Sequence, residues 1–248
     1  MRMKSFLIIA AILLIASCTK ESDSNSNAAS GGAGKGGSLA RFTVVNNNLY
    51  LVDDYTLKVF DVSNASNAVL RNTVTLRFGV ETIYPYKDKL FIGSRDGMYI
   101  YSIANPDAPV LVGEARHTRS CDPVVANDSI AFVTLRGNQP CGPAEDGLYI
   151  YNIKNVLTPA LIHKKPIPTP HGLALQDSLL YVCQKNNGLG IYNISNPAAP
   201  VLRKQISNKV FEDVIVYDGI LICYISTGLA LYNIAIPANP VLLRLIDN

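Results

Sequence analysis

Apolar residues alternate with polar or aromatic ones in short runs from residue 39 to the end of the chain. In one such segment the alternation predicts four strands, at 172–176, 179–184, 189–194 and 200–207. Turn-forming stretches such as Asn-Pro-Ala-Ala-Pro separate the runs, and no amphipathic segment with a helical period appears. The pattern therefore predicts an all-β fold of short antiparallel strands.

The same pattern occurs five times at a nearly constant spacing. The aromatic residue in the third run of each copy follows the previous one by 41, 50, 41 and 40 residues, at Phe60, Tyr101, Tyr151, Tyr192 and Tyr232. This period indicates repeats at about 39–76, 77–117, 118–168, 169–207 and 208–248. A four-stranded sheet that is apolar on both faces needs neighbours on both sides. We therefore predict a five-bladed β-propeller of four-stranded antiparallel blades.

The first and last strands are both in phase with the repeat, so no exchanged strand closes the ring. Side-chain packing between the first and last blades would then close it. An open curved stack and a ring completed by a second chain are the alternatives. We favour the closed ring, because open ends would leave two apolar sheet faces in water.

The repeat has a recognisable motif, apolar-x-apolar-aromatic-[Asn/Asp/Ser]-apolar, usually followed by Asn-Pro. One copy is Leu189-Gly-Ile-Tyr-Asn-Ile ahead of Pro200-Val-Leu. Over residues 39–248 this motif resembles the LVIVD-repeat family of bacterial proteins. The resemblance implies a β-propeller and does not imply an activity.

The N-terminus has the features of an export signal. Arg2 and Lys4 precede an apolar run over 6–15, which is shorter than the ~20 residues that a membrane-spanning helix needs. The following Leu-Ile-Ala-Ser-Cys18 resembles the lipobox of bacterial lipoproteins. The resemblance implies cleavage of residues 1–17 and acylation of Cys18, and an ordinary signal peptide with an incidental cysteine is the alternative.

Residues 18–38 are mostly Ser, Asn, Gly and Ala, so we expect a disordered tether. By analogy with lipoprotein sorting, Thr19 favours an outer-membrane lipoprotein of the bacterial cell envelope. The acidic residues that follow resemble, loosely, a signal for exposure on the cell surface. The membrane is then reached through the N-terminal lipid.

Composition excludes one class of partner. The chain has 22 Lys and Arg against 19 Asp and Glu, and removal of Arg2 and Lys4 leaves 20 against 19. Such a balance gives no electrostatic basis for binding nucleic acid.

A column of ionisable residues is the best candidate binding site. Nine residues before the apolar-aromatic pair of the second strand, the repeats carry Ala40, Glu81, Asp122, His171 and Glu212. These positions start the innermost strand, so their side chains are expected to converge at one mouth of the central channel, where carboxylates attract a divalent cation. The alternative is that they only accept backbone amide hydrogen bonds at strand starts. The LVIVD family commonly has His-Asp here; His171-Gly172 keeps the His and Glu212-Asp213 keeps the acid.

The third repeat carries a nine-residue insertion within 136–147, between its second and third strands. This loop is expected on the same face as the ionisable column, beside Cys121. Export permits a disulfide, and we predict one between Cys121 and Cys141. A zinc site would need further ligands, for which His117 is the one nearby candidate. Cys183 and Cys223 lie within second strands and are expected to be buried free thiols.

No nucleophile motif, zinc-protease motif or phosphate-binding loop is present in the sequence. The predicted function is therefore a lipid-anchored envelope protein whose propeller binds or scaffolds an unknown protein or glycan. The alternative is a carbohydrate hydrolase that uses carboxylates such as Glu81 and Glu212 at the channel mouth. No further cofactor is expected.

Overall fold

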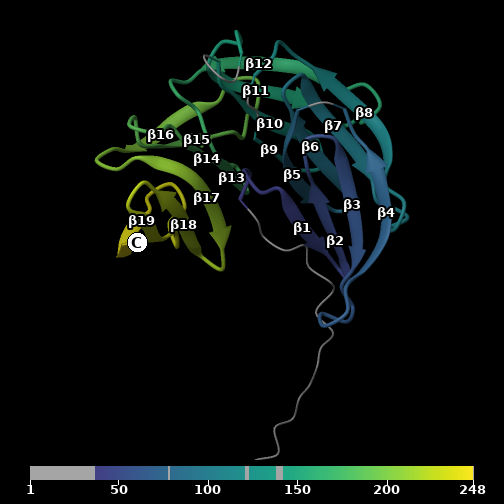
Figure 1. The fold of residues 1–248 in the computed structure, drawn as a ribbon. Coiled ribbons are helices and arrows are strands. Elements are labelled where there is room, and N and C mark those ends of the chain that lie inside the picture. The colour runs from purple at the N-terminus through teal and green to yellow at the C-terminus, as the bar shows by residue number, and fades with distance from the viewer. Residues whose placement is uncertain (1–36, 78, 121–122, 138–141, 248) are drawn as a thin grey trace, which may run out of the picture. The chain divides into compact units, whose positions relative to one another are not determined.

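The computed structural model describes residues 37–77, 79–120, 123–137 and 142–247. Over these residues it contains twenty strands in five four-stranded antiparallel sheets, which stand in a ring as the blades of a β-propeller (Figure 1). Each blade uses four consecutive strands, with the first innermost. The predicted fold class is confirmed.

Blade one contains β1 (Phe42–Val45), β2 (Asn48–Val52), β3 (Thr56–Asp61) and β4 (Val69–Thr75). Blade two contains β5 (Val80–Tyr86), β6 (Lys89–Ser94), β7 (Gly97–Ser102) and β8 (Val110–Arg116). Blade three contains β9 (Val124–Ala126), β10 (Ile130–Leu135), β11 (Gly147–Asn152) and β12 (Ala160–Pro166). Blade four contains β13 (Leu173–Gln176), β14 (Leu179–Cys183), β15 (Leu189–Asn193) and β16 (Val201–Ile206). Blade five contains β17 (Phe211–Tyr217), β18 (Ile220–Ile225), β19 (Gly228–Asn233) and β20 (Val241–Asp247).

Burial explains why the inner strands are apolar on both sides. In blade two every residue of β6 after Lys89 is buried, whereas the outermost strand β8 is mostly exposed or half-buried. Alternate residues of an inner strand pack on the preceding and the following blade. Four apolar clusters result, one at each interface between blades one and two, two and three, three and four, and four and five.

The regular spacing of the motif has a local structural cause. The side-chain oxygen of Asn193, directly after the aromatic residue, accepts the backbone amide of Ser195 at 3.0 Å and so forms the turn into the outer strand. Asn152, Asn233 and Asp61 accept the amide two residues on in the same way. A β-bulge precedes the aromatic residue of every blade and sets the register of the outer strand.

Closure of the ring differs from the expectation. No apolar cluster among the described residues joins blades one and five, so the predicted side-chain packing between them is not observed. Hydrogen bonds at the axis connect the two blades instead: the Ser38 hydroxyl and the Leu39 amide both donate to the Asp213 carboxylate. The two ends of the ring thus meet at the centre through polar contacts.

The insertion of blade three lies where it was predicted, between Leu135 of β10 and Gly147 of β11. Its described part is attached to blade four, because Asp146 accepts the amides of Gly137 at 2.8 Å and of Thr169 at 3.0 Å.

Cys183 and Cys223 are buried and free, as predicted, and burial raises the pKa of both thiols. Cys121 and Cys141 lie outside the described residues, so the disulfide stays a prediction. Cys18, the signal peptide and all of the tether except residues 37 and 38 also lie outside them. Over the described residues, no helix has the length and hydrophobicity needed to cross a membrane.

Candidate functional site

The predicted ionisable column does start the innermost strands. Glu81 and Glu212 are the second residues of β5 and β17, His171 lies two residues before β13, and Ala40 lies two residues before β1. Asp122 lies outside the described residues. Each innermost strand neighbours the innermost strand of the next blade from blade one to blade five, which places the column around the axis.

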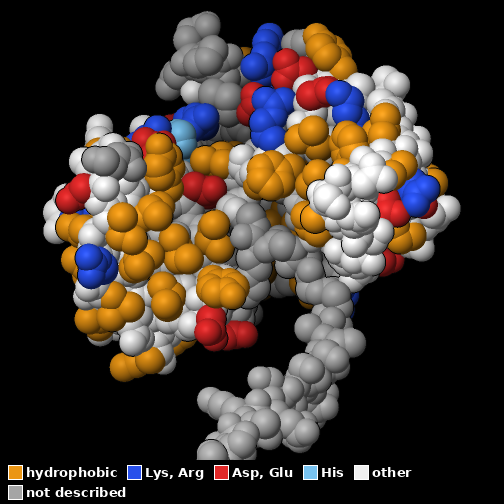
Figure 2. Space-filling view, turned by 60° about the horizontal axis from the view of Figure 1, so that its bottom comes forward, with side chains coloured by type: hydrophobic (Ala, Val, Ile, Leu, Met, Phe, Trp, Pro, Cys, Tyr) orange, Lys and Arg blue, Asp and Glu red, His pale blue; other side chains and the backbone are white. Residues whose placement is uncertain are grey.

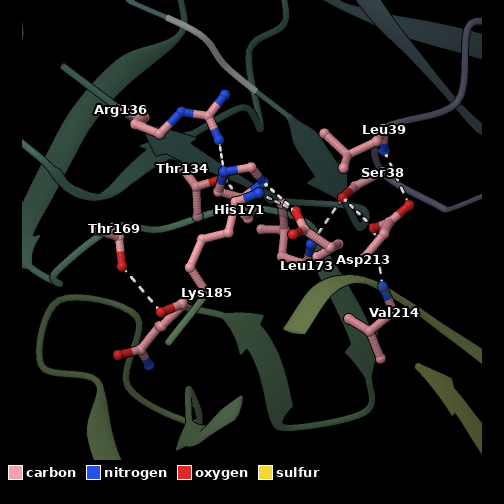
Figure 3. Close-up of polar contacts among 12 residues, drawn as sticks. Ser38, Leu39, Thr134, Arg136, Thr169, His171, Leu173, Lys185, Asp213 and Val214 are labelled. Atoms are coloured by element: carbon pink, nitrogen blue, oxygen red, sulfur yellow. Dashed lines mark hydrogen bonds and ion pairs between the residues drawn. The ribbon is translucent and has the colours of Figure 1, made fainter. Parts of the chain in front are cut away.

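Two of these residues meet side chain to side chain. Nδ1 of His171 lies 3.5 Å from Oε2 of Glu212, and the same carboxylate oxygen accepts Nζ of Lys185. On the opposite edge of the imidazole, the guanidinium of Arg136 donates to Nε2 of His171 (Figure 3). The structure therefore contains a chain of polar contacts, Arg136 to His171 to Glu212 to Lys185, which runs across blades three, four and five.

Burial and the neighbouring positive charges both act on the pKa of His171. Burial first, and then the positive charges of Arg136 and Lys185, lower the pKa of His171 to about 3. The imidazole is neutral at physiological pH, and the tautomer in which Nε2 accepts from Arg136 carries its proton on Nδ1, which forms no hydrogen bond with any described residue and lies 3.5 Å from Glu212. His171 is also fixed by its backbone, since its carbonyl accepts the hydroxyl of Thr134 at 2.7 Å.

Arg136 is the partly buried cation of this network. Burial lowers its pKa, while the negative charges of Glu81, Asp146 and Glu212 oppose that shift. A guanidinium has five N–H donors, and His171 accepts one of them. Arg136 thus has several N–H donors, and it interacts electrostatically with three carboxylates of the described residues, to which no hydrogen bond is observed.

The carboxylates of the column are paired with cations. Glu81 accepts Nε of Arg95 at 3.0 Å, and Glu212 contacts Lys185 and His171. Within the described ranges, no group of three or more His, Cys, Asp or Glu side chains has the arrangement of a metal site. The divalent cation expected from the sequence therefore stays a prediction, with Asp122 outside the described residues.

Asp213 occupies a different environment from Glu212. Its carboxylate accepts the Ser38 hydroxyl at 3.3 Å, the Leu39 amide at 3.4 Å and the Val214 amide at 2.9 Å (Figure 3). Burial outweighs these hydrogen bonds and raises the pKa of Asp213 to about 6.

Gly172 makes room for this carboxylate. A Cβ at Gly172 would lie 2.0 Å from Oδ1 of Asp213. Glycine at position 172 therefore has a steric reason: the Asp213 carboxylate of blade five occupies the space that a side chain would need.

The sequence reasoning missed the basic partners, although a signal for them was present. Five residues after the apolar residue that anchors each second strand, the repeats carry Asp54, Arg95, Arg136, Lys185 and Ser226. In an antiparallel pair the second strand ends beside the start of the first, so this column lies against the acidic one. Arg95, Arg136 and Lys185 are its three basic members, and in blade one the polarity is reversed, with Arg41 donating to Asp54 at 3.0 Å.

Glu81 forms an ion pair with Arg95, and Glu212 forms one with Lys185. The fold and the axial network together define a β-propeller with a cluster of ion-paired and hydrogen-bonded side chains at one mouth of its central channel.

Comparison with known protein families identifies two of the repeats. The LVIVD repeat family model matches residues 36–75 and 171–207, which belong to blades one and four. The chain therefore contains LVIVD repeats, which confirms the resemblance found in the sequence. No curated protein matches the chain.

Solved structures share the fold at low identity. The periplasmic gluconolactonase PpgL of Pseudomonas aeruginosa is 10% identical with a TM-score of 0.63, and the match covers 82% of this chain and 68% of that one. Apo AztD of Citrobacter koseri is 12% identical with a TM-score of 0.58, covering 81% and 60%. The computationally designed protein Ika8 is 14% identical with a TM-score of 0.59, covering 82% and 59%. The chain thus spans about 60–70% of the length of these structures, and at such identities they show the fold alone.

Proposed function

We propose that the protein is a lipid-anchored component of the bacterial cell envelope, attached through Cys18 at the outer membrane, and that its propeller is a non-catalytic binding module. The binding site is the mouth of the channel, and the ligand is an envelope molecule that presents an anionic group. The observation that carries the proposal is Arg136, a half-buried guanidinium at the axis with one hydrogen-bond acceptor, His171, among the described residues.

The chemistry of a guanidinium favours this class of ligand. Its planar fork matches a carboxylate or a phosphate with two parallel hydrogen bonds. Neutral His171 holds the fork from one side without neutralising its charge. Lys185 lies across the same network and adds a second positive charge. An acidic glycan fits both this chemistry and the proposed location.

No observation favours the hydrolase. The likeness to a gluconolactonase concerns the fold, and both carboxylates that would form a catalytic pair are ion-paired.

Isothermal titration calorimetry with oligogalacturonate, a carboxylate-bearing glycan probe, tests the proposal. We expect wild type to bind and Arg136→Gln to weaken binding about 10- to 150-fold, which corresponds to the ~1.5–3 kcal/mol of a hydrogen bond to a charged group. Arg116→Gln is the matched control, because Arg116 is paired with Glu114 on the outer strand β8, away from the axis. Its isotherm should match that of wild type.

Three results would contradict the anionic ligand. If neutral galactose oligomers bound as tightly as oligogalacturonate, the carboxylate of the probe would not contribute to binding. An isotherm with calcium alone that Glu81→Gln abolishes would favour the cation predicted from the sequence. Release of shortened sugars from the probe would favour the hydrolase.

A further inference from the structure

Blades one and five each present an apolar face that no other described blade covers. Phe42 of β1 pairs with Leu51 of β2. The residues equivalent to Phe42 in blades two to five are Ile83, Val124, Leu173 and Val214. Those four residues are 1%, 0%, 1% and 1% exposed, because each packs on the preceding blade. Phe42 is 60% exposed. The side of blade one that points toward blade five therefore lacks the cover that every other blade has.

The opposite side of blade five shows the same contrast. Tyr224 of β18 is 51% exposed, whereas Val52 and Cys183, at equivalent positions in blades one and four, are 1% and 0% exposed. Tyr217 on the same side is 56% exposed, and Ile222 beside them is half-buried although its equivalents are fully buried aromatic residues. Apolar side chains gather over blade five in Figure 2.

The two ends of the ring are joined at the axis although these faces are exposed. Ser38 is 1% exposed; its hydroxyl accepts the amide of Leu173 at 2.7 Å and donates to Asp213. These bonds hold the residues before β1 to blades four and five at the axis. The outer parts of both faces nevertheless remain in water. We define the seam as these two faces: Phe42, Leu49, Leu51 and Phe60 of blade one, and Tyr217, Ile222 and Tyr224 of blade five.

We propose that a second copy of this chain covers the seam. Each internal interface pairs the trailing side of one blade with the leading side of the next, and the seam offers one free side of each kind. Two copies related by a twofold axis place blade five of each against blade one of the other. One symmetric contact then buries all four free faces.

Size and composition support this occupant. Three aromatic side chains that are more than half exposed leave roughly 300 Å² of apolar surface in water, before the half-buried aliphatic residues are added. Summed over both faces of the seam, this area lies at the lower end of the ~300–600 Å² that the largest apolar patch of a typical monomer exposes. Residues 18–36 contain Ser, Asn, Gly, Ala and charged residues, so they offer no large apolar side chain to fill the seam themselves.

Crosslinking between two tagged forms of the full-length protein in bacterial membranes tests the proposal. One form carries Phe42→Cys and the other Tyr224→Cys, and the membranes are treated with a short bis-maleimide. We expect a crosslinked dimer that contains both tags. Val110→Cys replaces Phe42→Cys in the matched control, because Val110 is also 60% exposed but lies on an outer strand; that pair should give less than a tenth of the dimer.

A second measurement keeps the proposal falsifiable if crosslinking is inefficient. The double variant Phe42→Glu, Tyr224→Glu should shift the purified protein from dimer to monomer by light scattering, with at least a tenfold weaker dissociation constant. The circular dichroism spectrum should be unchanged, and Val110→Glu should stay dimeric. A crosslink that forms within one chain carrying both cysteines, but not between chains, would show that the ring closes on itself. A wild-type monomer at all concentrations would also overturn the proposal.

Discussion

Replacement of Asp213 by Asn should change how the stability of the propeller depends on pH. Asp213 is a largely buried carboxylate at the junction of blade five with Ser38 and Leu39 (Figure 3). Burial raises its pKa from 3.8 to about 6. The folded state therefore holds the proton more tightly than the unfolded state between these two pH values.

The sign and size of the effect follow from proton linkage. Where the folded state binds more protons, the free energy of unfolding falls as pH rises. Asp213 therefore costs nothing below its unfolded pKa of 3.8, and the cost grows until the pH exceeds its folded pKa of about 6. At ~1.4 kcal/mol for each pH unit between the two pKa values, the full cost is about 3 kcal/mol. The asparagine side chain does not ionise, so the variant escapes this cost, although it keeps one acceptor oxygen in place of two.

Urea unfolding of both proteins at several pH values from about 4 to about 7 measures the effect. We expect the stability of Asp213→Asn relative to wild type to increase by about 2–2.5 kcal/mol over this range, because a part of the full cost is already present at about pH 4. The comparison cancels every other titration, including that of His171, whose lowered pKa makes stability fall as pH drops below 6.5. Thr227→Ala, in an exposed turn of the same blade, changes no titratable group; it is the control and should show a constant difference. A constant difference for Asp213→Asn as well, or one that decreases with rising pH, would refute the reasoning.

Three further predictions follow from the same residues. Gly172→Ala places a methyl group 2.0 Å from Asp213 and should lower the free energy of unfolding by about 1–3 kcal/mol in urea titrations; an unchanged midpoint would mean that the two residues do not touch. Thiol titration should find Cys183 and Cys223 unreactive in the folded protein because they are buried; after denaturation without reductant, two thiols in the propeller fit the Cys121–Cys141 disulfide and four do not. Cys18→Ala should release the protein from membranes in a carbonate wash, and retention of the variant would contradict the lipid anchor.

Much of the fold could be predicted from the sequence because the same four-strand pattern occurs in five repeats. The strands predicted for the fourth repeat agree with β13 to β16 within one residue at each end. Local chemistry explains this success: an Asn or Asp after the aromatic residue closes its own turn, and alternation sets which side chains face each neighbouring blade. Cys183 and Cys223 were identified as buried thiols for the same reason.

Only the tertiary structure decided how the ends of the ring and the channel mouth are completed. The pairing of Glu212 with His171 and Lys185 depends on how two blades are spaced, and no local pattern carries that distance. The same holds for Arg136, whose role depends on contacts across three blades. Closure is a property of the whole ring: each blade interface is encoded by adjacent repeats, whereas the junction of blade five with blade one depends on the accumulated rotation of all five. That is why the repeat predicted four interfaces correctly, and why Phe42 and Tyr224, apolar by the same rule, remain in water.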